Sequence, residues 1–280
     1  MAMIGTMELQ RSAHRAAFAL DIVGNSALRL WVHTGLLLLA MAIPTLVALA
    51  IDERLLNGAN VWSKPLKFQL SVSLHLFTLA VLAALLAERV RGGRLLRATA
   101  WISAAMAILE IGYITLQAGR GRASHFNADT PLEAGLYAAM GIGAVTLVAA
   151  SAVVGILLLR APRAGIGPGL RWGGALGLIV GSVATLAVAG YLSTLGGHWI
   201  GGVASDAGGL PITGWSTSGG DIRVSHFFAT HMMQGLPLVG FAADRLGRDG
   251  RTTAVVACGL WVAVVVGTFL QALLGQPLLG

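Results

Sequence analysis

The chain has 280 residues, of which 56% are hydrophobic and only 11% are charged, and its formal net charge is +7. A soluble domain carries about 25% charged residues, so this composition excludes an ordinary water-soluble globular protein. The isoelectric point near 10.7 is high enough for nucleic-acid binding. The basic residues stand in short stretches beside apolar runs, however, so we expect no nucleic-acid partner.

The N-terminal segment, residues 1–28, is mixed in character and is predicted to lie in the cytoplasm. The apolar run that follows Arg29 is too long for the hydrophobic region of a typical signal peptide. The one cysteine, Cys258, lies inside an apolar run, which excludes an intramolecular disulfide.

Seven apolar runs follow, each long enough to cross about 30 Å of hydrocarbon at about 1.5 Å per helical residue. Lipid offers no partners to backbone polar groups, so each run is predicted to be a helix. The sequence therefore predicts an all-α integral membrane bundle of about seven transmembrane helices, forming one domain over residues 29–280. The predicted spans are 29–51, 66–87, 98–119, 133–159, 172–196, 225–243 and 253–275.

The basic residues give these spans a direction. If the N-terminus is cytoplasmic, every loop on that side is rich in arginine, which the positive-inside rule requires. This predicts an extracytoplasmic C-terminus and a location in the bacterial cytoplasmic (inner) membrane, with the lipid bilayer as a partner. Trp31, Trp101 and Trp172 are then expected near the inner interface, as part of an aromatic belt.

Two sequence stretches predict helix starts. Ser63, followed by Lys64 and Pro65, predicts a cap and an early proline for the second span. The stretch Thr130-Pro131-Leu132-Glu133 is a capping box with proline at the first helical position.

In the fifth span, Gly173, Gly177 and Gly181 form a GxxxGxxxG face, which predicts close contact with another helix. Packing inside the chain is the favoured interpretation, and a homo-oligomer seam is the alternative. The longest predicted connection, residues 197–224, is rich in glycine and fits either a mobile cover or a re-entrant segment.

Polar residues gather in the outer halves of three spans, where ionisable groups are costly and usually functional. Helical spacing puts them on one face of each of the second and third spans and at the outer end of the sixth. These faces predict one outward-facing polar cavity. The residues are Lys64, Lys67, Ser71 and His75; Glu110, Tyr113 and Gln117; and Asp221, Arg223, His226, Thr230, His231 and Gln234.

Lys64 and Lys67 stand in the first turn of a helix, where the dipole disfavours cations by about 0.3–1 kcal/mol. They predict a cationic entrance for a small anionic or amphipathic, lipid-like ligand that the protein binds or transports, with His75 and Glu110 as a proton relay. The alternative is that both lysines pair with Asp52, Glu53, Asp129 or Asp221. The predicted ligand-binding residues are Lys64, Lys67, His75, Glu110, Tyr113, Gln117, Arg120, Arg223 and Gln234.

Histidines and acids of the same region are ligand types for zinc or another divalent metal. The candidates are His75, His125, Asp221, His226 and His231. His75 and His231 are also a candidate axial pair for haem, which would make the chain a haem or quinone-linked redox protein. The alternative is that each histidine is hydrogen-bonded inside the bundle.

Two stretches, 60–68 and 221–227, resemble signatures of bacterial membrane proteins of unassigned function. Ser71, His75, Glu110 and the His226/His231 pair also partly resemble the CREST membrane metal-hydrolases, which include alkaline ceramidases and adiponectin-receptor-like proteins.

The resemblance to the CREST hydrolases implies seven helices and zinc held by His75, His226 and His231. Glu110 or Ser71 would then be the catalytic residue that assists the bound water in hydrolysing a lipid-like substrate. The chain departs from that family in three ways. Glu110 replaces an aspartate, the late histidines are spaced HxxxxH instead of HxxxH, and they precede the last helix.

Overall fold

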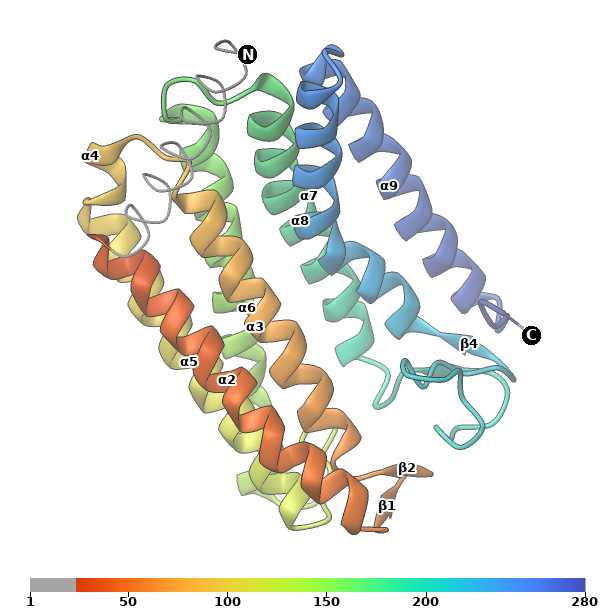
Figure 1. The fold of residues 1–280 in the computed structure, drawn as a ribbon. Coiled ribbons are helices and arrows are strands. Elements are labelled where there is room, and N and C mark those ends of the chain that lie inside the picture. The colour runs from red at the N-terminus through yellow and green to blue at the C-terminus, as the bar shows by residue number, and fades with distance from the viewer. Residues whose placement is uncertain (1–23, 280) are drawn as a thin grey trace, which may run out of the picture.

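The computed structural model describes residues 24–279, so most of the predicted N-terminal segment lies outside the described residues. The described chain is a helical bundle, which confirms the predicted all-α fold (Figure 1). Its helices are α2 (Ser26–Ile51), α3 (Ser63–Ala83), α4 (Glu88–Arg91), α5 (Arg94–Gly119), α6 (Pro131–Arg160), α7 (Pro168–Ser193), α8 (Ile222–Arg245) and α9 (Gly250–Leu273).

Two antiparallel pairs of two-residue strands lie in the connections. The first pair joins β1 (Leu55–Leu56) to β2 (Ala59–Asn60), and the second joins β3 (Trp199–Ile200) to β4 (Gly220–Asp221). Both pairs lie at the same end of the bundle (Figure 1).

The long helices form two groups. Helices α2, α3, α5 and α6 pack together as the first group, and α7, α8 and α9 form the second. The packing of α6 against α7 joins the groups, whereas α8 touches α3 only sparsely. The sparse contact between α3 and α8 is therefore a second, weaker seam between the groups.

The two ends of the bundle differ in their connections. At one end, which we call the arginine end, the links 84–93, 161–167 and 246–249 are short (Figure 1). At the opposite end, which we call the loop end, the links 52–62, 120–130 and 194–221 include the longest in the described chain.

The chain is an integral membrane protein by the length and apolarity of its helices. Six helices, all of the long ones except α8, are long and apolar enough to cross a membrane. Large apolar side chains point outward from them; Ile142 is 69% exposed and Trp101 is 66% exposed. Such a surface is stable in lipid but not in water.

Helix α8 is the more polar exception. It has 24 residues, which gives it a length of about 36 Å at 1.5 Å per residue. It packs on both α7 and α9, which shelter much of its surface. The seventh predicted span is thus present as a long helix, but its sequence is less apolar than the other six.

The helix starts agree only in part with prediction. Thr130 caps α6 by accepting a hydrogen bond from the backbone N–H of Glu133, and Pro131 opens the helix, as expected. The prediction that Ser63 caps α3 is wrong, because the cap position is Trp62 and the Ser63 hydroxyl donates to the Asn60 carbonyl instead.

The second span also ends earlier than predicted. Helix α3 stops at Ala83 rather than at residue 87, and the short helix α4 follows. The backbone of this link bonds to the α6–α7 link, where Ala87 N–H donates to Ala161 and Arg163 N–H donates to Leu85. These hydrogen bonds between the two links take the place of the last helical turn that was predicted for the second span.

The glycine face of α7 packs against α8. A Cβ added to Gly177 would lie 2.6 Å from the carbonyl oxygen of Met232, and Gly173 meets Leu236 as closely. This confirms packing inside the chain. The face named for the alternative, a homo-oligomer seam through Gly173, Gly177 and Gly181, is occupied by α8 of the same chain.

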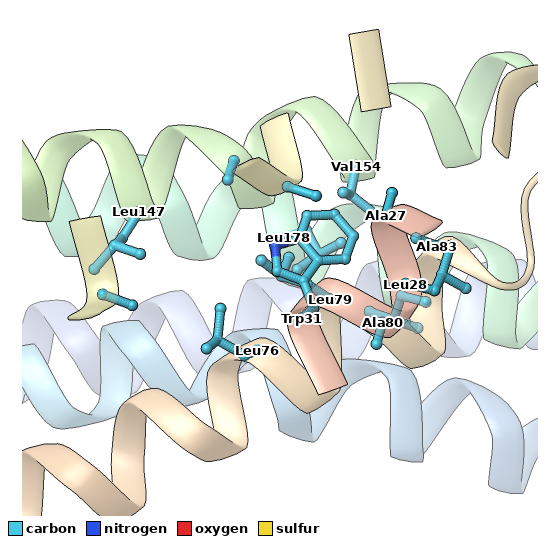
Figure 2. Packing of buried hydrophobic residues seen from close by; sticks show 14 of the residues in the cluster. Ala27, Leu28, Trp31, Leu76, Leu79, Ala80, Ala83, Leu147, Val154 and Leu178 are labelled. Atoms are coloured by element: carbon cyan, nitrogen blue, oxygen red, sulfur yellow. The ribbon is translucent and has the colours of Figure 1, made fainter. Parts of the chain in front are cut away.

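The apolar core of the first helix group lies toward the arginine end. Trp31 is 0% exposed and is surrounded by Leu28, Leu79 and Ala80 (Figure 2). Its indole N–H donates to the Ser103 hydroxyl at 2.8 Å. The prediction that Trp31 belongs to an interfacial belt is therefore wrong, since the residue is a core residue.

Candidate functional site

Side chains from several elements converge at the loop end of the first helix group. The imidazole of His125, in the α5–α6 connection, lies with its ring centre 5.5 Å from that of Phe68 on α3 and 5.9 Å from that of Tyr137 on α6. The Lys64 ammonium lies 6.0 Å from the centre of the same Phe68 ring. His125 thus sits between α3 and α6 beside a lysine.

His226, in the first turns of α8, also belongs to the surroundings of His125. Burial lowers the pKa of His125 well below its usual value, and the charges of Lys64 and His226 lower it further. Such charge effects act over short distances, so His226 and Lys64 both lie near the ring. His125 is consequently neutral at physiological pH.

Glu110 on α5 adds an acid to the group. It is 7% exposed, and its Oε2 atom has no hydrogen-bond partner among the described residues. It faces Gly143 on α6, where an added Cβ would lie 3.8 Å from Oε2. The charges of Lys64 and Glu110 act on each other, although the two side chains form no ion pair.

We call Lys64, Glu110, His125 and His226 the loop-end cluster. His125 Nδ1 lies 3.1 Å from the Ser124 hydroxyl, but the other three members lack hydrogen-bond partners at a polar atom. Besides Glu110 Oε2, the buried Nδ1 of His226 has no hydrogen-bond partner within residues 24–279. The ammonium of Lys64 has only the contact with Phe68 described above. Buried polar groups are nearly always satisfied, so two buried unsatisfied atoms beside a lysine that lacks an ion pair require an explanation.

The other cationic side chains that were predicted to bind the ligand already have hydrogen-bond or ion-pair partners in the protein. Lys67 donates to the carbonyl of Thr213 at 2.9 Å, and Arg120 donates to Gln117 Oε1 at 2.9 Å. Arg223 bonds to Asp206 and Asp221, at 2.8 and 2.7 Å. Of the cations predicted to bind a ligand, Lys64 is the one left without a protein anion or carbonyl in the described chain.

Three of the four acids proposed as alternative partners for the lysines, Asp52, Asp129 and Asp221, are paired with arginines instead. Asp52 pairs with Arg54 at 2.6 Å, which lowers its pKa below the usual range, mainly through hydrogen bonds from Arg54. Asp129 pairs with Arg122 at 3.1 Å. These pairs leave Lys64 unneutralised.

The α7–α8 connection, residues 194–221, covers part of the loop end. It is tied to the first helix group at two points: the N–H of Asp206 donates to the Asn57 carbonyl at 2.8 Å, and Lys67 holds Thr213. It is tied to α8 by Arg223, which donates to the Gly214 carbonyl at 2.7 Å. We call this connection the cover.

Asp206 is the centre of the cover. It accepts from His198 at 3.1 Å and from Arg223 at 2.8 Å. Burial opposes the charged form of Asp206, but the bonds and charges of His198 and Arg223 outweigh burial and lower its pKa. The cover therefore contains a charged, hydrogen-bonded carboxylate.

His75 does not point into the cluster. Its Nε2 lies 3.3 Å from the Ser151 hydroxyl on α6, and its ring also bonds to the Leu147 carbonyl. This arrangement matches the alternative in which the histidine is hydrogen-bonded inside the bundle. Among the described residues, no hydrogen bond joins His75 to Glu110 as the predicted relay would require, and His75 instead joins α3 to α6.

Tyr113 and Gln117 continue the polar face of α5 toward the loop end. Gln117 is fully buried, and its amide donates to the Tyr113 hydroxyl at 3.0 Å. Its oxygen accepts from Arg120. Tyr113 and Gln117 thus have partners in α5 and in the connection that follows it, where Arg120 and the Ala123 carbonyl bond to Gln117. This distinguishes them from Glu110, which lies one turn deeper than Tyr113 and has an unpartnered oxygen.

Deeper in the bundle, α8 meets α3 through two hydrogen bonds in series. His231 Nδ1 lies 3.2 Å from Gln234 Oε1, and Gln234 Nε2 donates to the Thr78 hydroxyl at 3.2 Å. His231 thus points toward α3 and has a partner already. Ser71 is exposed, and its hydroxyl donates only to the Phe68 carbonyl within α3.

The predicted metal ligands do not meet. Within residues 24–279, no group of three or more His, Cys, Asp or Glu side chains is arranged to hold a metal ion. Asp221 is bound to Arg223 and caps α8. The zinc set implied by the resemblance to the CREST hydrolases, His75, His226 and His231, does not fit these positions. The haem pair does not fit either, since His75 is already hydrogen-bonded to Ser151 through Nε2 and to the Leu147 carbonyl.

Comparison of the chain with protein-family models, with curated proteins and with solved structures gave no match. The candidate site therefore rests on its own geometry.

Sequence reasoning missed three contributors. Phe68 and Tyr137 flank His125, and Asp206 organises the cover. The two aromatic residues look like ordinary lipid-facing side chains in the sequence. Asp206 gave a weak signal, as the single acid between residues 194 and 220 of a glycine-rich stretch.

Proposed function

We propose that the protein binds a small anionic or amphipathic ligand at the loop end, with Lys64 as the residue that takes the anionic group. One observation carries the proposal: Lys64 is a partly buried cation that lacks an ion pair and a hydrogen-bond acceptor in the described chain, whereas Lys67, Arg120 and Arg223 each have a carbonyl, amide or carboxylate oxygen. Placing a cation there costs free energy unless something compensates it.

The side chains around Lys64 favour an anionic ligand that also has an apolar group. Phe68 and Tyr137 provide aromatic surface beside the cation, and neutral His125 adds a hydrogen-bonding ring without adding charge. The proposed orientation puts the loop end outside the bacterial cytoplasmic membrane, because the arginine-rich links are at the other end. The ligand would then enter from the outer side.

Binding of two carboxylate probes, propionate and oleate, tests the proposal with purified protein in phosphatidylcholine nanodiscs at pH 7. Lys64→Gln should weaken the binding of whichever probe the wild type takes by about tenfold or more, because a charge-assisted hydrogen bond contributes about 1.5–3 kcal/mol. Isothermal titration calorimetry gives the affinities.

Lys67→Gln is the matched control. It removes the same charge one turn away, but its ammonium is already bonded to Thr213. We expect a change of less than about threefold in affinity. Equal losses in the two folded variants, or no binding of either probe to the wild type, would contradict the proposal.

A further inference from the structure

We infer that the ligand is a long-chain carboxylate of the membrane, such as a fatty acid, whose charged group binds Lys64 and whose chain lies between α3 and α8. The inference rests on the proposed function and names the substrate class of that site. Its basis is the stretch of the α3–α8 seam formed by residues 67–78 and 223–234, which we call the seam window. Hydrogen bonds close this stretch at both ends but leave side chains between them exposed.

The cover closes the seam window at the loop end. Lys67 on α3 donates to the Thr213 carbonyl at 2.9 Å. Arg223 on α8 donates to the carbonyl of the next residue, Gly214, at 2.7 Å. Consecutive residues of the cover therefore bridge the two helices, and a molecule that came to the seam straight from the water would have to break these bonds.

The opposite end of the seam window is closed deeper in the bundle. There Gln234 Nε2 donates to the Thr78 hydroxyl at 3.2 Å. Residues 67–78 of α3 and 223–234 of α8 span eleven helical steps each, which is about 16 Å at about 1.5 Å per residue. The two walls of the window are thus equal in length and joined to each other at both ends.

Between these two ends, the walls pack only sparsely against each other. On α3, Ser71 is exposed and Leu74 is 45% exposed, and on α8 Phe227 is 40% exposed. Ser71 stands one turn before His75 on the same helix face, and His75 bonds to α6. The exposure of Ser71 therefore extends from the lipid-facing side toward the interior of the bundle.

The position of the window determines what fills it. The window belongs to α3, an apolar helix long enough to span the membrane, so it opens toward the hydrocarbon of the loop-end leaflet. Its exposed Leu74 and Phe227 are apolar. An apolar chain from the bilayer matches these walls, whereas a small water-soluble anion makes no use of them.

Lys64 lies at the loop end of the same α3 face. It precedes Ser71 by seven residues, or about two helical turns. Its ammonium lies 6.0 Å from the ring centre of Phe68, one turn further along α3. The cation is therefore beside the window, and a carboxylate that binds it places the attached chain along Ser71 between α3 and α8.

Photolabelling tests the inference with the full-length protein in phosphatidylcholine nanodiscs at pH 7. The probe is palmitate with a diazirine at the methyl end of its chain, and mass spectrometry locates the label. We expect label in residues 71–78 and 227–238, reduced about tenfold or more by excess oleate and by Lys64→Gln. Label around Ile142, which is 69% exposed on α6, reports ordinary contact with the bilayer and should change with neither.

A variant that fills the window provides a second test. Ser71→Trp puts a large ring where the chain would lie, so oleate should bind about tenfold or more weakly in isothermal titration calorimetry. Ser193→Trp is the matched control, because Ser193 is also an exposed serine whose hydroxyl donates to a carbonyl three residues earlier in its helix. It should change the affinity by less than about threefold. Should Ser71→Trp fail to fold, photolabelling of the wild type decides alone.

The outcomes separate the inference from the proposed function. Lys64-dependent binding of propionate at least as tight as that of oleate would overturn the inference and keep the proposed function. Label in the window no stronger than around Ile142, or equal oleate affinities of the two tryptophan variants, would do the same where Lys64→Gln still weakens binding. An absence of Lys64-dependent binding for both propionate and oleate would overturn both.

Discussion

Helix α8 has two interfaces with opposite properties. Toward α7 the contact is made by backbone atoms, with glycines of α7 facing carbonyl oxygens of α8. Toward α3 the contact within the bundle is sparse, and the side-chain amide of Gln234 donates to the Thr78 hydroxyl there. The first interface is fixed mainly by close backbone contacts at glycines, whereas the second depends on side-chain contacts that can change.

This difference bears on function because the loop-end cluster lies beside the sparse interface. Helices α7, α8 and α9 can act as one body, held by the close α7–α8 contact. The cover spans the sparse interface by bonding to Asn57 and Lys67 on one side and to Arg223 on the other. Movement that admits a ligand is therefore expected at the α3–α8 interface and not at the α7–α8 interface.

The largest expected effect comes from disturbing the α7–α8 interface. Gly177→Ala places a methyl group 2.6 Å from the Met232 carbonyl oxygen. Overpacking of this kind costs about 1–3 kcal/mol, so the variant should unfold at a clearly lower temperature in detergent. Differential scanning fluorimetry measures the midpoint.

Gly190→Ala provides the comparison within the same helix, since nothing lies within 4 Å of the added Cβ. Alanine is the better helix former by about 0.5–1 kcal/mol, so this variant should be as stable as the wild type or slightly more stable. A Gly177→Ala variant with the stability of Gly190→Ala would contradict the close α7–α8 packing.

A smaller effect is expected at the cover. Asp206→Asn removes the charge that binds His198 and Arg223. Hydrogen bonds to charged groups contribute about 1.5–3 kcal/mol, so amide protection in residues 199–215 should fall about tenfold or more. Hydrogen-exchange mass spectrometry reports protection factors for this segment and for α7 as an internal reference, which should not change.

The same carboxylate makes the cover sensitive to acid. Because the pKa of Asp206 is lower in the folded protein than in the unfolded chain, its contribution is complete above the unfolded value of about 4. The contribution is lost as the pH falls from there through the folded value. Protection of the cover should drop over that range in the wild type but not in Asp206→Asn, and parallel curves would contradict the role of Asp206.

The smallest effect is expected from the side-chain bond between α3 and α8. Thr78→Val removes the acceptor of Gln234, and single bonds of this kind in membrane proteins contribute about 0.6 kcal/mol on average. Thr146→Val is matched, because Thr146 bonds only within its own helix. The difference in unfolding midpoint between the two variants isolates the contact, and no difference would show that the bond is negligible.

Features set by local pattern were predictable from the sequence. The apolar runs gave the long helices, Thr130 and Glu133 gave the start of α6, and the glycine spacing gave a close contact. Helix ends governed by distant contacts were not predictable. Trp62 replaces Ser63 as the cap of α3, and the end of α3 depends on bonds between links nearly 80 residues apart.

The sequence by itself determined that this protein is a helical membrane bundle with polar residues concentrated at one end, because hydrophobicity and helical period are properties of neighbouring residues. Only the tertiary structure decided which polar residues have partners. Lys64 and Lys67 look equivalent in the sequence, yet a carbonyl 146 residues away binds Lys67 and leaves Lys64 free. Such partners come from distant parts of the chain, so the folded arrangement alone distinguishes a structural cation from a candidate ligand-binding one.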